Sequence, residues 1–304
     1  MDQSVQSAPR WSRKGKIVAI ASPPLLALVY IVISLISANV LTHASNHKDE
    51  IAPQAIGADA KVWSTRTSDG ITLRGLYLPT PEHRKLIVLV HGMGSSRDEM
   101  AGLGRDLHAR GFDILLFDLR GHGESDPSRL SMGRNERKDL RAVLAWAKHE
   151  GYTPDRIGWL GYSMGAATIL MEGAVNPDFR VAILDSPFGD LPDLLNSQLP
   201  KHSHLPKFFN PGILFAAHRA YGIRTDDIRP SRSASDWRGR PILLIHGEAD
   251  TTVPVRQSRE IARTLGSSCT LVTLPGVEHV EAYRSNPKEY VDRAQAFFNE
   301  HLGK

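Results

Sequence analysis

The chain has 304 residues, a formal net charge of +4 and one cysteine, Cys269. This length suffices for one domain with a full hydrophobic core, and a single cysteine excludes an intramolecular disulfide. The net charge is modest and several basic residues stand together near the N-terminus, so the composition gives no reason to expect a nucleic-acid partner.

The first expected element is a helix over residues 17–41, a stretch without a charged residue. A helix of about 25 residues exceeds the roughly 30 Å hydrocarbon core of a bilayer, so we expect a single transmembrane anchor. Pro23 and Pro24 would mark its membrane interface or kink it. A buried core helix and a cleaved signal peptide remain alternatives, the second because residues 42–44 suit a cleavage site.

The charges that flank this helix predict its orientation. Those before it are Arg10, Arg13, Lys14 and Lys16, and those after it are Lys48, Asp49 and Glu50. The positive-inside rule leaves residues 1–16 in the cytosol and places a polar linker, residues 42–61, on the other side. We therefore expect a single-pass membrane protein whose catalytic domain is extracytoplasmic.

Residues 62–304 are expected to form one α/β domain. The segments 62–66 and 71–78 flank a Ser-Asp-Gly turn and predict a hairpin. Apolar strand patterns near Leu86, Ile114, Ile157, Val181, Ile242 and Thr270 then alternate with helix-compatible segments at 100–110, 134–150, 165–175, 255–265 and 287–301. Such alternation predicts a mostly parallel sheet that is covered on both faces.

Two glycine-rich segments follow strand patterns in this domain. Residues 91–96, His-Gly-Met-Gly-Ser-Ser, taken alone read as an ordinary turn after a strand. Residues 161–165, Gly-Tyr-Ser-Met-Gly, stand between a buried strand pattern and a helix-compatible run. This second segment has the pattern of a nucleophile elbow, in which the glycines leave room for Ser163 to stand clear of the backbone.

A nucleophilic serine needs donors for the oxyanion that forms when it attacks a carbonyl. A helix N-terminus favours developing negative charge, so the backbone N–H of Met164 is one candidate. The N–H of Met93, in the loop at 91–96, is the candidate for the second donor. We predict that these two groups form an oxyanion hole.

The serine hydroxyl is a weak nucleophile near neutral pH, so it also needs a histidine base and a carboxylate that orients the base. Asp250 lies in the loop after the strand pattern at 241–245, and His279 follows the strand pattern at 269–274. We predict His279 as the base and Asp250 as the acid. Asp185, which follows the strand pattern at 181–184, is an alternative acid, and the role of Glu278 stays open.

The order Ser163, Asp250, His279, each beyond a strand, resembles the α/β-hydrolase superfamily. The resemblance runs from about residue 62 to residue 301 and includes residues 117–125, which are similar to the D-x-R-G-x-G-x-S loop of its lipase, esterase and serine-peptidase-like branch. It implies an α/β-hydrolase fold, a mostly parallel, doubly covered sheet with a cap insertion, here preceded by one transmembrane helix.

The expected cap is the insertion at about 187–237, where the alternation of strands and helices breaks. Its apolar residues are Leu194, Leu195, Leu199, Phe208, Phe209, Ile213, Leu214, Phe215 and Tyr221. These side chains would pack on the main domain, line an acyl pocket, or reach toward the membrane, and the sequence leaves all three open.

The remaining histidines do not indicate a metal or cofactor site. His91, His122 and His246 lie beside strand ends or glycines, where a histidine usually braces the backbone. His202 and His204 have no nearby cysteine or carboxylate cluster, which makes a poor metal site. The chain also lacks a phosphate-binding loop and a dinucleotide fingerprint. We expect no metal and no cofactor.

The sequence thus predicts a membrane-anchored serine hydrolase that cleaves a carboxylic ester or related acyl bond of a small or lipid-like substrate through an acyl-enzyme on Ser163. The same residues would serve a peptidase, an amidase, a thioesterase or an acyltransferase. A binding protein that kept the fold without the chemistry is a further alternative. The sequence does not indicate an oligomeric state.

Overall fold

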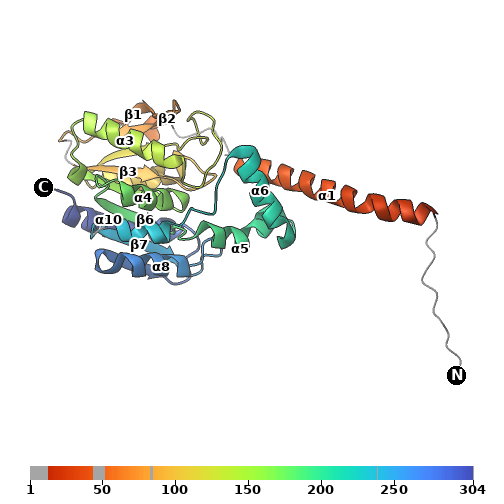
Figure 1. Cartoon of the computed structure of the whole chain (residues 1–304). Helices are drawn as coiled ribbons and strands as arrows, with labels where there is room; N and C mark the ends of the chain where they lie inside the picture. Colours follow the sequence, from red (N-terminus) through yellow and green to blue (C-terminus); the bar gives the residue numbers. More distant parts are fainter. Residues whose placement is uncertain (1–12, 44–51, 83–84, 238, 304) are drawn as a thin grey trace, which may run out of the picture.

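The computed structural model describes residues 13–43, 52–82, 85–237 and 239–303, with side chains in the first of these segments from residue 23 onward. Its centre is an eight-stranded sheet in the order β1-β2-β4-β3-β5-β6-β7-β8 (Figure 1). The strands are β1 Lys61–Arg66, β2 Thr72–Leu78, β3 Leu86–Val90, β4 Asp113–Phe117, β5 Ile157–Tyr162, β6 Val181–Asp185, β7 Ile242–Gly247 and β8 Cys269–Leu274.

The strands from β3 to β8 run parallel, whereas β2 is antiparallel to both of its neighbours, β1 and β4. Every residue of β3, β4, β5, β6 and β7 is buried. A parallel strand covered on both faces needs a nearly continuous apolar sequence, and this explains the unbroken hydrophobic runs in these segments. The predicted hairpin and mostly parallel sheet are confirmed.

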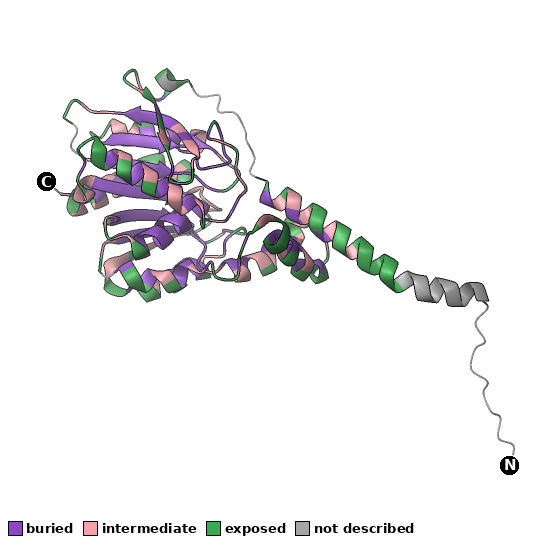
Figure 2. Ribbon diagram, turned by 45° about the horizontal axis from the view of Figure 1, so that its top comes forward, coloured by how far each residue is buried: buried purple, intermediate pink, exposed green. Residues whose placement is uncertain are grey.

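Helices cover both faces of the sheet (Figure 2). Side chains from α3 Glu136–His149, α4 Met164–Val175 and α8 Arg256–Leu265 pack in one core layer. Those from α2 Ala101–His108 and α10 Pro287–His301 pack in the other, near the short α9 Ala282–Ser285. Short 3₁₀ turns lie at η1 Pro53–Ala55, η2 Arg97–Met100, η3 Pro154–Arg156, η4 Lys207–Phe209, η5 Ala234–Trp237 and η6 Gly266–Ser268.

The insertion between β6 and β7 is helical. It contains α5 Leu191–Ser203, α6 Asn210–Tyr221 and α7 Pro230–Ser233. Of these, α5 and α6 form, together with the end of the first helix, a small hydrophobic cluster of their own. We refer to α5, η4 and α6 as the cap.

The first helix, α1, spans Arg13–Thr42 and projects from the domain, with only its C-terminal end beside α6 (Figure 1). It begins before the expected residue 17 and contains both Pro23 and Pro24 in its interior. The segment expected as a polar linker, residues 42–61, includes parts of the folded structure, because Thr42 is the last residue of α1 and the Ile56 side chain is buried in the core. Arg10, Lys48, Asp49 and Glu50 lie outside the described residues.

Candidate active site

Ser163 occupies a sharp turn between β5 and α4. Its backbone has φ 48° and ψ −112°, a conformation that costs energy for a residue with a side chain. A Cβ on Gly161 would lie 2.6 Å from the Ile169 side chain, and a Cβ on Gly165 would collide with the carbonyl oxygen of Val90. The two glycines are therefore required by close packing, and they allow the strained turn that presents the Ser163 hydroxyl.

The three residues predicted as a triad lie in one hydrogen-bonded chain. The Nε2 atom of His279 is 2.9 Å from the Ser163 hydroxyl oxygen, and Nδ1 is 2.6 Å from Oδ2 of Asp250. Ser163 stands at the end of β5, Asp250 in the loop after β7, and His279 in the loop after β8. The carboxyl ends of β5, β7 and β8 lie at the same edge of the parallel sheet and bring the three residues together. In sequence, Asp250 and His279 are 87 and 116 positions from Ser163.

Asp250 is fixed by more than His279. Its Oδ1 accepts hydrogen bonds from the backbone N–H groups of Thr252 and Val253, at 2.8 and 2.7 Å. Nε2 of His246 is 3.1 Å from Oδ2. Burial alone would raise the pKa of Asp250, but the hydrogen bonds from His246 and His279 hold that pKa below its usual range. The carboxylate is therefore charged and oriented toward the histidine.

The two other acids considered from the sequence lie elsewhere. Asp185 is fully buried at the end of β6, where its Oδ1 accepts a hydrogen bond from Ser186 at 2.9 Å. Glu278 is exposed, and its carboxylate faces the backbone N–H and hydroxyl of Thr251 at 3.4 and 3.5 Å. Neither carboxylate is a hydrogen-bond partner of His279, so the geometry favours Asp250 for the orienting position.

Met93 and Met164, the residues predicted to supply the oxyanion donors, both border the same cavity as Ser163. Met164 is the first residue of α4, and Met93 lies in the loop after β3. Among the described residues, neither backbone N–H donates to a protein acceptor. Neither group is thus engaged by another described part of the protein.

Two histidines brace the loop that carries Met93. His91 accepts a hydrogen bond at Nε2 from Leu119 N–H, and His122 accepts one at Nε2 from Gly94 N–H, at 3.0 and 3.2 Å. Burial, and secondarily the neighbouring His122, lowers the pKa of His91 to about 3. Both rings act as neutral connectors between the loops after β3 and β4, as the sequence predicted.

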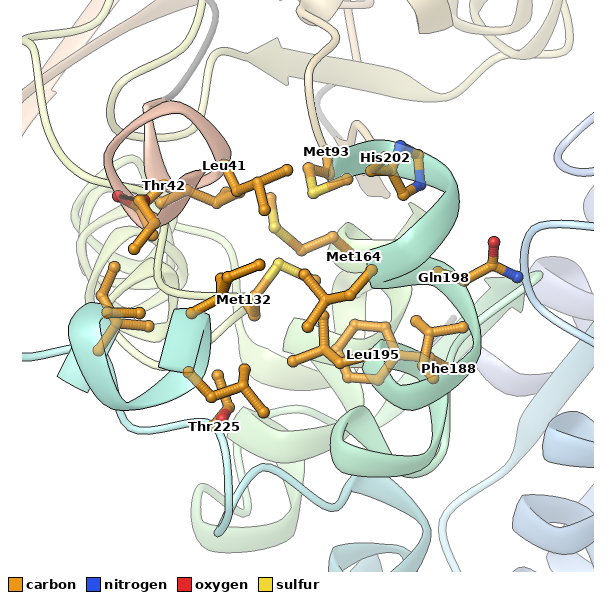
Figure 3. A pocket seen from close by; sticks show the side chains of 18 of the residues that line it. Leu41, Thr42, Met93, Met132, Met164, Phe188, Leu195, Gln198, His202 and Thr225 are labelled. Carbon is orange, nitrogen blue, oxygen red and sulfur yellow. Dashed lines mark hydrogen bonds between the residues drawn. The ribbon is translucent and has the colours of Figure 1, made fainter. Parts of the chain in front are cut away.

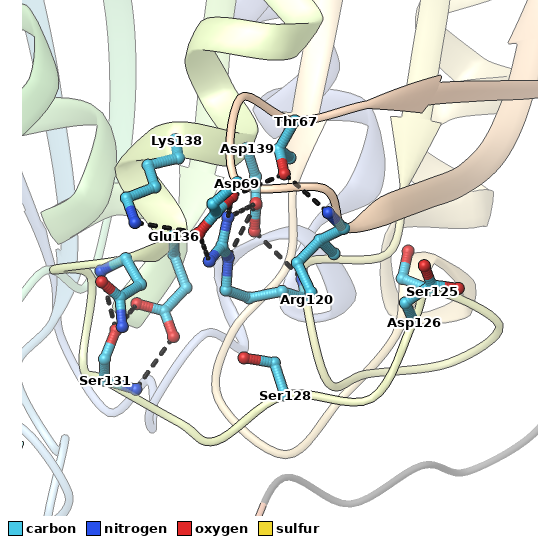
Figure 4. Close-up of polar contacts among 12 residues, drawn as sticks. Thr67, Asp69, Arg120, Ser125, Asp126, Ser128, Ser131, Glu136, Lys138 and Asp139 are labelled. Atoms are coloured by element: carbon cyan, nitrogen blue, oxygen red, sulfur yellow. Dashed lines mark hydrogen bonds and ion pairs between the residues drawn. The ribbon is translucent and has the colours of Figure 1, made fainter. Parts of the chain in front are cut away.

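The loop at residues 117–125 is held by buried ion pairs. Arg97 donates to Asp118 at 2.9 Å, and the Arg97 backbone N–H donates to the same carboxylate. Arg120 bridges Asp69 and Asp139, with both partners within 3.0 Å (Figure 4). These contacts explain the charged residues of the motif, which support the catalytic loops without touching Ser163 or His279.

Comparisons with known proteins agree with this geometry. Residues 81–211 match a family model described as "Serine aminopeptidase, S33", and residues 214–298 match one described as "TAP-like protein". The structure of the Pyrococcus furiosus esterase Pf2001 superimposes with a TM-score of 0.70, at 23% identity, over 86% of this chain and 100% of that one. The chain has the α/β-hydrolase fold.

Two curated relatives have sequence identities to this chain that are close to that of the esterase. The uncharacterized protein YfhR of Escherichia coli K12 is 26% identical over 223 residues, which are 71% of this chain and 72% of the relative. The monoacylglycerol lipase of Mycolicibacterium smegmatis is 24% identical over 261 residues, 75% of this chain and 92% of that protein.

A mostly apolar cavity of about 170 Å³ opens beside Ser163 in the hydrolase (Figure 3). No Asp, Glu, Lys or Arg of the described chain lines it. The residues of the insertion that line it are Phe188, Leu194, Leu195, Gln198, Leu199, His202, Ile213, Leu214, Ala217, Ile223 and Thr225, of which Phe188, Ile223 and Thr225 lie in the segments flanking the cap. Phe208 and Phe215 instead stay largely exposed. Of the three roles left open for the insertion's apolar residues, the structure thus assigns lining of the pocket to Leu194, Leu195, Leu199, Ile213 and Leu214.

Sequence reasoning missed other residues of the hydrolase's site. Ala38, Leu41 and Thr42 of α1 line the pocket, although their sequence suggests only a membrane anchor. Ser186 and Val280 have φ of 51° and 52°, and Val280 N–H donates to the Ser186 hydroxyl at 3.4 Å beside His279. A positive φ at a residue other than glycine leaves no pattern in a single sequence, so no signal pointed to them.

Metal binding has no structural support in the described part of the hydrolase, where no group of three or more His, Cys, Asp or Glu residues is suited to hold an ion. His202 lines the apolar pocket and His204 ends α5. Cys269 is partly buried, and burial raises the pKa of its thiol to about 12, so it is not an activated nucleophile.

Proposed function

We propose that this protein is a membrane-anchored serine hydrolase that cleaves a carboxylic ester through an acyl-enzyme on Ser163. The observation that carries the proposal is the hydrogen-bonded chain from Asp250 through His279 to Ser163, which ends at the mouth of an apolar pocket. This is the arrangement that activates a serine for attack on a carbonyl.

In the proposed reaction, the Ser163 hydroxyl oxygen attacks the ester carbonyl while Nε2 of His279 takes its proton. Asp250 holds the Nδ1–H side of the ring and stabilises the imidazolium that forms. The N–H groups of Met93 and Met164 stabilise the oxyanion. His279 then gives its proton to the leaving alkoxide, and a water molecule activated by the same ring releases the acid.

An ester with an apolar acyl chain is the substrate class that the site supports best. The pocket beside Ser163 lacks charged side chains among the described residues, so it offers no partner for a charged peptide side chain or terminus. The named activities of the monoacylglycerol lipase and the esterase among the similar proteins point in the same direction. Cleavage of amides, thioesters or peptides and acyl transfer would use the same catalytic residues.

The proposed anchor is α1, in which Pro23–Thr42 is apolar enough to cross a bilayer and is largely unburied within the protein. A core helix of a soluble domain would be buried, and this one exposes nine large apolar side chains. The exposed residues are Leu25, Leu26, Leu28, Val29, Ile31, Val32, Leu35, Ile36 and Val40. With the basic residues ahead of it, we place the N-terminus in the cytosol and the catalytic domain outside.

Hydrolysis of 4-nitrophenyl esters by the purified full chain tests the proposed reaction. We expect the Ser163→Ala variant to lose the activity, while a Ser197→Ala variant, altered in α5 outside the hydrogen-bonded chain, keeps it. An unchanged rate in a folded Ser163→Ala protein, prepared free of host esterases, would sink the proposal. Faster turnover of matched peptide or thioester substrates would keep the serine mechanism and replace the ester as substrate.

A further inference from the structure

The C-terminal end of α1 is packed against the cap rather than joined to it by a loose linker. Ser34 and Ala38 are buried in this contact, and a Cβ on Gly212 of α6 would lie 2.7 Å from the Tyr30 ring. The Gly212 N–H donates to the Tyr30 hydroxyl at 3.1 Å, and this hydroxyl donates to the Phe208 carbonyl at 3.0 Å. Side chains of α1 therefore contact the backbone of the cap directly.

The last turn of α1 is also fixed by the main domain. Arg129 donates to the Asn39 carbonyl at 3.3 Å, to the Asn39 side chain at 2.9 Å and to the Thr42 hydroxyl at 3.0 Å. The Leu130 N–H donates to the Thr42 carbonyl at 3.0 Å. The carbonyls at a helix C-terminus lack partners within the helix, and these bonds satisfy those of Asn39 and Thr42 and form a joint between the helix end and the main domain.

This joint forms part of the pocket beside the serine. Ala38, Leu41 and Thr42 line the same cavity as Ser163, and Leu41 lies on the side of Met93 and Met164 (Figure 3). The pocket is thus bounded by three structures, namely the main domain, the cap and the helix that we propose crosses the membrane. Without α1, one side of the pocket would be open.

The length of α1 sets the depth of this wall in a bilayer. Counted from Lys16, the last basic residue before the apolar stretch, about 20 residues at 1.5 Å each cross a 30 Å hydrocarbon core and end near Ile36. Ala38 to Thr42 then lie at the level of the lipid head groups. Tyr30 lies about 9 Å deeper than Ile36, and the exposed Phe208 ring stacks beside it at 6.1 Å between centroids.

We infer that the last turns of α1 form a wall of the acyl pocket and that the site takes the acyl chain of an ester dissolved in the bilayer which α1 crosses. This inference rests on the proposed function. The ester groups of membrane lipids lie at the head-group boundary, the depth of Ala38 and Leu41, so a chain need move only a short way from the leaflet into the pocket. On the cap, Phe208 exposes its ring beside Tyr30 of α1.

The proposal that α1 forms a wall of the acyl pocket is tested by measuring how the protein in nanodiscs discriminates between short and long acyl chains. We expect Ala38→Trp, which fills the pocket side of α1, to lower the ratio of kcat/KM for 4-nitrophenyl dodecanoate over butyrate at least tenfold. The matched control is Val40→Trp on the exposed face of the same helix, for which the ratio should stay within twofold of wild type. Leu41→Ala, which enlarges the pocket, should shift the preference toward longer chains.

An unchanged ratio in both Ala38→Trp and Leu41→Ala would overturn the wall, provided that a fluorophosphonate still labels these variants at the wild-type rate. If the wild type neither hydrolyses esters nor reacts with the fluorophosphonate, the proposed function fails. The contribution of α1 to the pocket is then measured by photocrosslinking instead. A palmitic acid with a mid-chain diazirine should then label main-domain residues of the pocket less in Ala38→Trp than in Val40→Trp. Equal labelling in the two variants would overturn the inference.

The bilayer source is tested with 4-methylumbelliferyl palmitate placed either in the vesicles that hold the enzyme or in separate vesicles. We expect initial hydrolysis at least tenfold faster when enzyme and ester share a membrane. Equal initial rates would overturn a bilayer route and indicate that the ester arrives through water.

Discussion

At the scale of single residues, the site combines strain with firm support. Ser163, Ser186 and Val280 all have positive φ, and all three lie beside His279 or carry its hydrogen-bond partner. Such conformations persist only where surrounding contacts hold them, and they concentrate at functional sites. The Ser163 N–H donates to the Asp185 carbonyl and the Ser186 N–H donates to the Ile245 carbonyl, each at 2.9 Å, and these bonds supply part of that support.

Replacing Asp250 with asparagine should lower kcat for ester hydrolysis about 10³- to 10⁴-fold, because the amide no longer stabilises the imidazolium or selects the correct tautomer. Glu278→Gln, one residue from His279 but facing Thr251, is the matched control and should keep nearly the wild-type rate. Steady-state kinetics with 4-nitrophenyl butyrate measures both. A larger loss in Glu278→Gln than in Asp250→Asn would mean that the wrong acid has been assigned.

Asp185 should make stability depend on pH. Burial raises the pKa of this carboxyl to about 6, above its value in an unfolded chain, so the folded state binds the proton more tightly. Stability should therefore fall as pH rises from about 4 to 6, by roughly 3 kcal/mol once the group is fully ionised. Asp185→Asn removes this fall.

Thermal unfolding of the full chain in detergent checks the Asp185 prediction. The difference in Tm between Asp185→Asn and wild type should be several degrees more positive at pH 7 than at pH 4.5. The exposed Asp227→Asn should show no comparable change between the two pH values. A Tm difference between Asp185→Asn and wild type that is the same at both pH values would contradict the assignment.

At the scale of elements, the sheet and the catalytic loops were largely predictable. The strand ends carry Ser163, Asp250 and His279, and continuous apolar runs before them identify parallel strands. The charged network of the loop after β4 was not predictable in its pairings, because Asp69 and Asp139 meet Arg120 only through tertiary packing. Hydrophobic patterns reveal which segments are buried, whereas pairings between distant loops depend on the fold.

The Arg120 network should matter for stability more than its surface neighbours. Arg120→Ala leaves the buried Asp139 with the backbone N–H of residue 120 but without its cationic partner, and it should destabilise the fold by about 3–5 kcal/mol. Lys138 is a partly exposed partner of Asp69, which also pairs with Arg120. Lys138→Ala should therefore lower the free energy of unfolding by less than about 1 kcal/mol. Thermal unfolding compares the two variants, and equal effects would refute the distinction between the buried and the exposed pair.

At the scale of the whole molecule, α1 was predicted as an anchor but not as part of the site. Its composition satisfies the requirements of a membrane span, and this dominant signal hides the small residues Ser34 and Ala38 that pack on the cap. A helix built for a bilayer and one built for close packing both use such residues, so sequence alone does not separate the roles. The joint to Arg129 appears only in the folded chain.

The contacts of α1 also predict that the helix is retained. Cleavage near residues 42–44 would remove a wall of the pocket and leave Arg129 without its partners in α1. Intact mass and alkaline extraction of membranes measure this directly. We expect the full chain in the membrane pellet, and a soluble product that begins after residue 43 would contradict the anchor.

If Ser163 is an activated nucleophile, it should react with a serine-specific fluorophosphonate. The purified full chain is treated with the probe, and the modified peptide is located by mass spectrometry. We expect modification of Ser163 in the wild type and no labelling of a correctly folded Ser163→Ala protein. Equal labelling of both proteins, or modification of a different serine, would contradict it.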